Sequence, residues 1–391
     1  LHNLPISSLF SMIRSGSSKS LAAIFLVLAA KDTMGFATEF ERIFVSQIAM
    51  IISAIVIVGY TALGGFLAAS TTDFIQSIIM SVALIIVFIF GINIAGGIPA
   101  VVENAQSLPG YLTMMTTYDP VAGVEQPYPI INIISMIAWG LGYFGMPHIL
   151  LRFMAIEDEE KLTLSRRVAT IWVVISLAVA VLIGVIGLAM SDVGALKTLT
   201  GSDSETIIVQ IADLLSKHGI LPALLAGTIL AGILASTMST ADSQLLAASS
   251  AVSSDLFGDR VAKTGDKKKA MNAARFTLLA IAVIAAFIAR DPNSSVFGIV
   301  SFAWAGFGAV FGPVVLFALF WRRSNWQGAL AGMISGGAMV FIWKYLVRPL
   351  GGVWNIYELL PAFSVSCLMI VIVSLLTKAP SKEITEEFDR V

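Results

Sequence analysis

Four hydroxyl side chains line one face of an otherwise apolar stretch, LAGILASTMSTADSQLLAASS, at residues 230–250. They are Ser236, Ser239, Thr240 and Ser243. Their spacing of i, i+3, i+4 and i+7 forms one column on a helix. Uncharged oxygens suit a small hard cation such as sodium, and polar groups inside a bilayer need partners. The column therefore indicates a sodium site, and the alternative is hydroxyls that bond back to their own helix or join neighbouring helices.

A second motif, WGLGYFGMPH at residues 139–148, lies in an apolar segment but favours a break in the helix. Its glycines loosen the backbone, and Pro147 has no N–H to offer the carbonyl of Tyr143. Broken helices line the substrate sites of many secondary transporters, because unsatisfied backbone is tolerated there. Trp139 and Tyr143 are four residues apart, which predicts one shared face that encloses a small apolar ring. The alternative is a kinked packing helix with an interfacial aromatic pair.

Two further segments carry candidate residues. Asp73 has Gln76 three positions later, a pattern that predicts a helix N-cap and equally a carboxylate on a cation path to the cytoplasm. Residues 301–313, SFAWAGFGAVFGP, place Gly308 and Gly312 at a spacing typical of close helix packing. Trp304, in the same segment, is a candidate gate for a cavity.

Composition places these motifs in a membrane protein. Hydrophobic residues make up 57% of the 391 residues and charged residues only 13%, with a mean hydropathy of +0.88. A soluble domain has about a quarter of its residues charged. The net charge of −1 leaves no basic face for a nucleic acid. We therefore expect a polytopic membrane protein.

Several kinds of chemistry are disfavoured by what the sequence contains. The single cysteine, Cys367, excludes a disulfide framework, and three scattered histidines argue against a transition-metal site. No phosphate loop, zinc motif or Ser/His/Asp constellation occurs in a suitable context. Asp242, Arg290 and Asp291 fall at predicted helix ends, where solvation explains them. We expect no enzyme activity, no organic cofactor and no metal other than sodium.

Apolar segments of spanning length, about 20 residues each, predict nine transmembrane helices. The segment 219–252 exceeds one span, so we expect it to project from the membrane or to bend. The nine segments are 45–69, 73–95, 130–151, 168–190, 219–252, 273–289, 296–321, 327–347 and 357–377.

Every second loop between these segments is basic. Lysine and arginine gather near 152–167 and 253–275, at Arg322 and Arg323, and in the tail, whereas 96–129 contains neither. Basic loops stay on the cytoplasmic side of a membrane. We therefore expect the C-terminus in the cytoplasm and the loop 96–129 outside.

Several stretches resemble the sodium/solute symporter family and, within it, the bacterial sodium/proline symporters. The resemblance runs from about Ile51 to the end of the chain, and its 139–148 motif is specific to the proline branch. The matching stretches are YTALGGFLAA at 60–69, WGLGYFGMPHILLRFM at 139–154, MST at 238–240, QLL at 244–246, and residues 301–316, 328–333 and 378–381.

The resemblance implies an all-α polytopic membrane protein with an inverted five-helix-repeat transporter fold, incomplete at the N-terminus, with about nine transmembrane helices in this chain. Residues 1–44 are expected to be an atypical N-terminal segment that does not match the family. Residues 45–377 then form the transmembrane symporter domain, and 378–391 a cytoplasmic tail. The family's first helices have no counterpart here, including a broken helix that supplies further sodium ligands, so we expect a truncated chain.

The resemblance also implies a sodium site. Ser239 and Thr240 match the family's hydroxyl ligands, and Ser236 matches a residue that offers its backbone carbonyl. Relatives have alanine where this chain has Ser236, which leaves a carbonyl role intact. Asp73 matches an acidic residue on the intracellular sodium path.

A substrate site is implied in the same way. Trp139, Tyr143 and Pro147 match residues implicated in proline binding. Met146 replaces a glutamine of the relatives, a change that bears on solute specificity.

The resemblance predicts sodium-coupled symport of L-proline across a bacterial plasma membrane by alternating access. Sodium is then the coupling ion, and L-proline, sodium and the lipid bilayer are the partners, with no nucleic acid and no obligate protein partner. Alternatives within the family are symport of pantothenate, another amino acid, a sugar or a sialic acid. A transporter-like sensor domain and a membrane enzyme are alternatives of other classes.

Overall fold

The computed structural model describes residues 39–256, 267–288 and 295–389 of the chain. It divides into two compact units, each described by itself below. The first unit comprises residues 1–109, 120–123 and 163–293, and the second comprises residues 110–119, 124–162 and 294–391. Of the segment 1–44, residues 1–38 lie outside the described part, as do Arg290 and Asp291.

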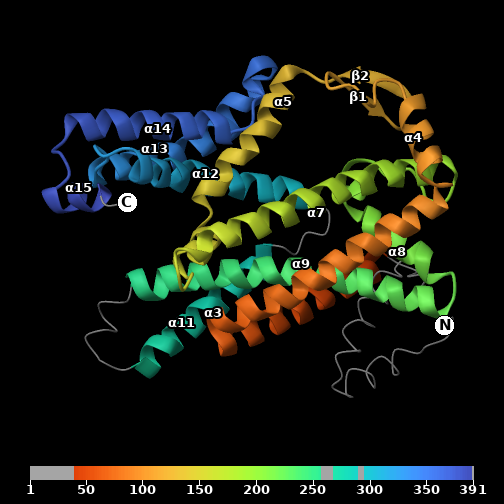
Figure 1. Ribbon diagram of the computed structural model, residues 1–391, viewed down its shortest axis with the longest axis horizontal. Coiled ribbons are helices and arrows are strands. Elements are labelled where there is room, and N and C mark those ends of the chain that lie inside the picture. Colours follow the sequence, from red (N-terminus) through yellow and green to blue (C-terminus); the bar gives the residue numbers. More distant parts are fainter. Residues whose placement is uncertain (1–38, 257–266, 289–294, 390–391) are drawn as a thin grey trace. The chain divides into compact units, whose positions relative to one another are not determined.

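The first unit is helical (Figure 1). Its long helices carry the apolar segments that the sequence predicts, and α9 continues into a π-helix at Ala251–Leu256. The elements are α3 (Glu39–Ile94), α4 (Ile98–Ser107), α7 (Lys161–Asp192), a 3-10 helix (Gly201–Thr206), α8 (Ile207–Ser216), α9 (Ile220–Ser250) and α11 (Lys267–Ile288).

A break at Gly65 divides α3 into two helices. Gly65 has φ 60° and ψ −153°, a backbone conformation that favours glycine because it has no Cβ. Tyr60, before the break, donates a hydrogen bond to Asp242 of α9. Ala83, after the break, packs against Gly232 of α9, since a Cβ added at Gly232 would lie 2.6 Å from the Ala83 Cβ. A straight helix would hold Tyr60 and Ala83 roughly 34 Å apart, but their partners on α9 are only about 15 Å apart along the axis. The chain therefore turns back at Gly65, as the two predicted segments require.

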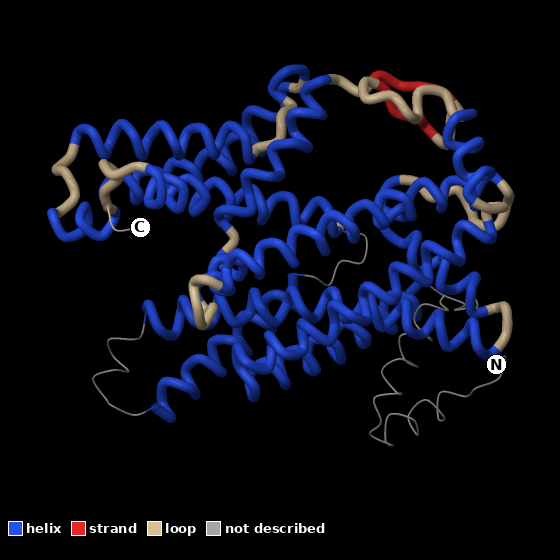
Figure 2. Tube along the Cα trace, in the orientation of Figure 1, coloured by secondary structure: helices blue, strands red, loops and turns tan. Residues whose placement is uncertain are grey.

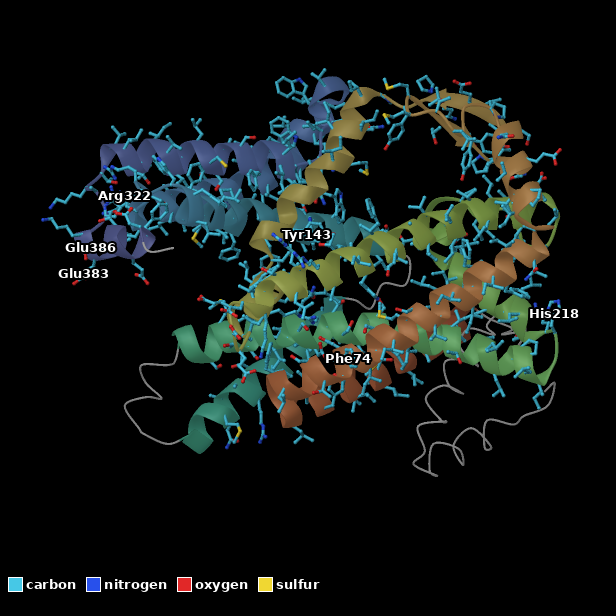
Figure 3. The ribbon with its side chains drawn as sticks, in the orientation of Figure 1. Phe74, Tyr143, His218, Arg322, Glu383 and Glu386 are labelled. Atoms are coloured by element: carbon cyan, nitrogen blue, oxygen red, sulfur yellow. The ribbon has the colours of Figure 1, made fainter. Side chains whose placement is uncertain are left out.

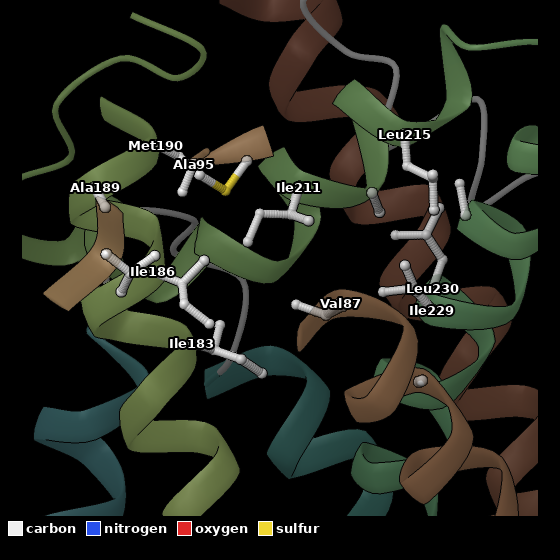
Figure 4. Packing of buried hydrophobic residues seen from close by; sticks show 14 residues of the cluster. Val87, Ala95, Ile183, Ile186, Ala189, Met190, Ile211, Leu215, Ile229 and Leu230 are labelled. Carbon is white, nitrogen blue, oxygen red and sulfur yellow. The ribbon is translucent and has the colours of Figure 1, made fainter. Parts of the chain in front are cut away.

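The core of the first unit lies among α3, α7, α8 and α9 (Figure 4). Met190, Ile211 and Ile229 are fully buried there. Lipid tails are as apolar as these side chains, so close packing rather than removal from water holds such helices together. Away from the core, α7 exposes Ile171 and Val174 by more than half of their surface, as expected for a face that meets lipid.

The second unit combines a β-hairpin with helices (Figures 1 and 2). The antiparallel strands β1 (Thr116–Asp119) and β2 (Val124–Pro127) pair Thr116 with Pro127 and Asp119 with Val124. The helices are α5 (Ile130–Ile137), the 3-10 helix η2 (Ala138–Gly145), α6 (Pro147–Met154), α12 (Val296–Phe320), α13 (Trp326–Ile342), α14 (Leu359–Leu376) and α15 (Lys382–Phe388). A π-helix (Trp343–Val347) and two 3-10 turns (Arg348–Leu350 and Gly352–Trp354) connect α13 to α14.

Glycines bring the helices of the second unit into close contact. A Cβ on Gly332 of α13 would lie 2.4 Å from a side-chain carbon of Ile370 on α14. A Cβ on Gly308 of α12 would lie 2.7 Å from the Cα of Gly142, and one on Gly312 would lie 2.9 Å from the ring of Phe363. The prediction that Gly308 and Gly312 serve close packing is therefore confirmed.

Eight helices among the described residues are long and apolar enough to cross a membrane. That number treats Met50–Ile94 as one helix, although the break at Gly65 divides it. The nine predicted spans therefore each have a helical counterpart, and the chain is a multi-pass membrane protein. α9 has 31 residues, which corresponds to about 46 Å and exceeds a hydrocarbon core of about 30 Å, as expected from the sequence.

Candidate functional site

The predicted sodium ligands lie on α9, in the first unit. Ser239 Oγ donates a hydrogen bond to the Ser236 carbonyl oxygen at 3.0 Å, and Thr240 Oγ1 donates to the same oxygen at 3.2 Å. Ser243 Oγ in turn donates to the Ser239 carbonyl at 3.0 Å. The column therefore exists, and its hydroxyls bond back to their own helix as the structural alternative proposed.

This bonding leaves the hydroxyl oxygens able to bind a cation. A hydroxyl has one hydrogen to donate and two lone pairs to accept with, so donation to Ser236 leaves the lone pairs of Ser239 and Thr240 available. Three oxygens, those of the Ser236 carbonyl and of these two hydroxyls, gather within one turn of helix. No group of three or more His, Cys, Asp or Glu suited to a metal occurs in the part of the chain that the structure describes. These three oxygens stay the predicted sodium ligands.

Asp73 lies inside the second half of α3, not at its beginning. The prediction of an N-cap at Asp73 is wrong, because the turn falls at Gly65 and the helix is already formed at Asp73. Thr71 and Thr72 show this directly, since their hydroxyls donate to the carbonyls four residues earlier, at 2.8 and 2.9 Å. The Asp73 side chain is half-buried there.

Asp242 does not lie at a helix end, where the sequence predicts it. It is fully buried within α9 and accepts hydrogen bonds from Tyr60 Oη at 2.7 Å and Ser243 Oγ at 3.2 Å. Solvation at a helix end therefore does not explain it. A carboxylate in the middle of an apolar helix by itself indicates a function or a buried partner, so its position in the sequence could have identified Asp242. Tyr60 also reaches the Met238 carbonyl at 3.4 Å, which joins α3 to the column.

The break predicted around Pro147 is present in the second unit. α5 ends at Ile137, η2 runs to Gly145, Met146 is extended with ψ 112°, and Pro147 begins α6. Proline is well suited to the first position of a helix because its missing N–H has no partner there. A 3-10 helix has three residues per turn, so Trp139 and Tyr143 do not share one helical face as we expected. Figure 3 labels Tyr143 on this segment, and its side chain is 54% exposed.

Trp304 of α12 connects the two aromatic residues instead. Its ring stacks on Trp139 with centroids 5.7 Å apart and meets Tyr143 edge-on at 4.8 Å. Its Nε1 donates to the Trp139 carbonyl at 2.9 Å. A Cβ on Gly142 would lie 1.9 Å from that nitrogen, so only glycine permits this approach. The candidate gate residue therefore lies against both candidate proline-binding rings.

Two aromatic residues that the sequence analysis did not select complete this group. Phe297 stacks on Trp139 at 5.4 Å, and Tyr357 stacks on it at 5.9 Å. We call Trp139, Tyr143, Phe297, Trp304 and Tyr357 the aromatic group. Phe297 and Tyr357 are distant from the broken helix in sequence, and only the packing of α12 and the segment before α14 brings them to it.

Comparison with known proteins relates the chain to sodium-coupled symporters. The model of the sodium:solute symporter family matches residues 11–336. The chain is 40% identical to the high-affinity proline transporter PutP of Bacillus subtilis over 336 residues, covering 85% of this chain and 66% of that protein. It is 37% identical to the sodium/proline symporter of Salmonella typhimurium over 380 residues, covering 96% and 72%. The chain thus spans about two thirds to three quarters of the length of these relatives.

A solved structure shows the same fold. The chain aligns with a sodium-coupled sialic acid symporter, determined in a substrate-bound outward-open state, with a TM-score of 0.62 and 16% identity. The alignment covers 95% of this chain and 73% of that one. At this identity the likeness bears on the fold alone, and it confirms the transporter fold expected from the sequence.

Proposed function

The chain belongs to the sodium:solute symporter family, and we propose that it carries L-proline across a bacterial plasma membrane together with sodium, by alternating access. Relatives named as proline transporters and sodium/proline symporters, at 36–40% identity, support proline as the solute. The observation that carries the proposal is the gathering of the Ser239 and Thr240 hydroxyls on the Ser236 carbonyl, inside an apolar helix. We also propose that the protein has no enzyme activity, no organic cofactor and no obligate protein partner.

Sodium would be held by Ser239, Thr240 and the Ser236 carbonyl. All three ligands are neutral, so a cation is bound without the full attraction of a direct carboxylate, which permits its release in each cycle. Asp73 belongs to the same unit and is proposed to attract the ion on its path to the cytoplasm. Its negative charge attracts a leaving cation without forming part of the first site.

Proline would be held by the aromatic group. The pyrrolidine ring is small and apolar, and the faces of Trp139 and Tyr143 offer it contact area. The Tyr143 carbonyl lies inside the 3-10 helix η2 and receives no hydrogen bond from Pro147, so its second lone pair can accept one from the secondary ammonium. Trp304 contacts both rings, so its movement would open or close the space beside them. We propose Trp304 as a gate on the basis of these contacts.

Solute specificity is tested by competition. Uptake of radiolabelled L-proline into proteoliposomes is measured with a large excess of unlabelled proline, pantothenate, sialic acid, glucose or another amino acid. We expect only unlabelled proline to abolish uptake, because the aromatic group offers area for a small ring and few polar contacts. Equal inhibition by another of these solutes would assign the site to that solute instead.

The orientation gives a second prediction. In a Cys367→Ser background, a membrane-impermeant thiol reagent should label a cysteine at Ser107 from outside intact cells, and one at Lys268 only after lysis. The reason is the retention of basic loops in the cytoplasm. The same alternation places the C-terminal tail, proposed as residues 378–391, in the cytoplasm. Labelling in the reverse order would overturn this topology.

A further inference from the structure

A buried carboxylate with two cationic partners lies in the connection between α13 and α14. The Glu358 side chain is 1% exposed, and its Oε2 lies 2.7 Å from Arg348 Nη1. Its Oε1 lies 3.7 Å from Lys344 Nζ, and that ammonium also sits 4.0 Å from the centre of the Phe302 ring. We call Lys344, Arg348 and Glu358 the ion cluster. Its residues belong to the connection between α13 and α14, which the proposed topology places outside the cytoplasm.

Burying these charged side chains costs free energy unless their partners are held in a favourable geometry. Removing a carboxylate from water costs several kcal/mol, which partners offset only when they are well placed. Further contacts place them: Arg348 Nε donates to Asn355 Oδ1 at 3.1 Å, and Trp343 Nε1 donates to the Ile356 carbonyl at 3.1 Å. The whole connection is thereby tied to the residues that immediately precede Tyr357.

Tyr357 joins this connection to the broken helix at two points and to α12 at a third. Its backbone N–H donates to Ser135 Oγ of α5 at 3.0 Å, and its hydroxyl donates to the Ser301 carbonyl of α12 at 2.6 Å. Its ring stacks on Trp139 of η2 with an interplanar angle of 15°. The residue is only 5% exposed. Tyr357 therefore fixes the position of Trp139 from the side of the α13–α14 connection.

We propose that Tyr357 is a wall of the proline site behind Trp139, and that Glu358, held by Arg348 and Lys344, is the positioning residue that sets Tyr357 there. This inference rests on the proposed function, since it assigns a further part of the same site. Glu358 acts through its neighbour: the ion cluster anchors the backbone at Glu358, and the backbone carries the Tyr357 ring against Trp139. Sodium binding involves α9 and is not expected to depend on it.

The test is equilibrium titration of the purified protein with L-proline at saturating sodium, and with sodium alone. Tyr357→Ala should weaken proline binding about tenfold, the scale of a lost aromatic pair. Glu358→Gln keeps the size of the side chain and removes its charge, and should weaken proline binding about threefold to tenfold because the effect passes through Tyr357. The sodium affinity of both variants should stay within about twofold of the wild type, since the α9 ligands are unchanged.

A matched control is available in the same unit. Asp389 pairs with Arg322 at 2.6 Å, but both side chains are more than half exposed. Asp389→Asn should leave both titrations unchanged, because an exposed ion pair contributes little. Arg348→Lys keeps the charge and loses the forked geometry, and should show a smaller loss in the same direction. It serves as the second variant if Glu358→Gln does not fold.

The double variant Tyr357→Ala/Glu358→Gln decides between positioning and general support. If Glu358 acts through Tyr357, the double variant binds proline no more weakly than Tyr357→Ala alone. Additive losses, or unchanged proline affinity in folded Tyr357→Ala, Glu358→Gln or Arg348→Lys protein, would overturn the inference. A folded wild-type protein that binds no proline at all would instead refute the proposed function, so the two failures are distinguishable.

Discussion

Replacing Ser239 or Thr240 by alanine is expected to raise the sodium concentration for half-maximal proline uptake at least about tenfold. Each change removes one of the three proposed oxygen ligands, and a hydrogen-bond-strength contact to a charge is worth on the order of 1.5–3 kcal/mol. About 1.4 kcal/mol corresponds to a factor of ten. The measurement is initial uptake at a fixed proline concentration over a series of sodium concentrations.

Thr237 provides the matched control for these variants. It lies on α9 between Ser236 and Ser239, and its hydroxyl donates to the Ile233 carbonyl at 3.1 Å, the same kind of bond that the column makes. It stands outside the i, i+3, i+4, i+7 column, so Thr237→Ala should leave the sodium dependence unchanged. If Ser239→Ala and Thr240→Ala behaved like Thr237→Ala, the hydroxyls would serve only their own helix and the sodium assignment would fail.

Tyr143→Ala is expected to weaken proline binding by roughly 1–3 kcal/mol, the scale of a lost aromatic contact. The exposed ring meets Trp304 edge-on, so it is accessible to a solute and is held in place by a neighbour. Sodium binding without proline should change much less, because the hydroxyl column lies on α9. Equilibrium titration of each ligand on the purified variant measures both effects.

Tyr143→Phe separates the ring from its hydroxyl. It keeps the edge-on contact with Trp304, and we expect proline affinity close to that of the wild type. If Tyr143→Ala bound proline within twofold of the wild type, the broken helix would be only a kink in the packing. The proline assignment would then lose its main structural support.

The sequence predicts most of the fold because the bilayer simplifies the problem. Spanning segments must be long and apolar, so length and composition locate the helices without any knowledge of their packing. The interruption at Pro147 is also local, since glycine and proline act on their own backbone. The hydroxyl column follows from helical spacing alone, and its hydrogen bonds to Ser236 lie within one turn.

Features that depend on distant residues were missed or misplaced. The turn at Gly65 leaves Asp73 inside a helix, although the sequence around Asp73 has the pattern of an N-cap. Asp242 is buried because Tyr60 reaches it from α3, which no local pattern reveals. Tyr357 and Phe297 join Trp139 only through the packing of the second unit. The placement of Asp242 and of the aromatic group therefore depends on tertiary contacts.

The most direct test of sodium-coupled proline transport is uptake of radiolabelled L-proline by the purified protein in proteoliposomes. Uptake is compared under an inward sodium gradient, under the same gradient of potassium, and with sodium equal on both sides. We predict accumulation of proline above its external concentration only under the sodium gradient, because downhill sodium entry supplies the free energy. Equal accumulation under the potassium gradient, or no uptake under any gradient by correctly folded protein, would contradict the account.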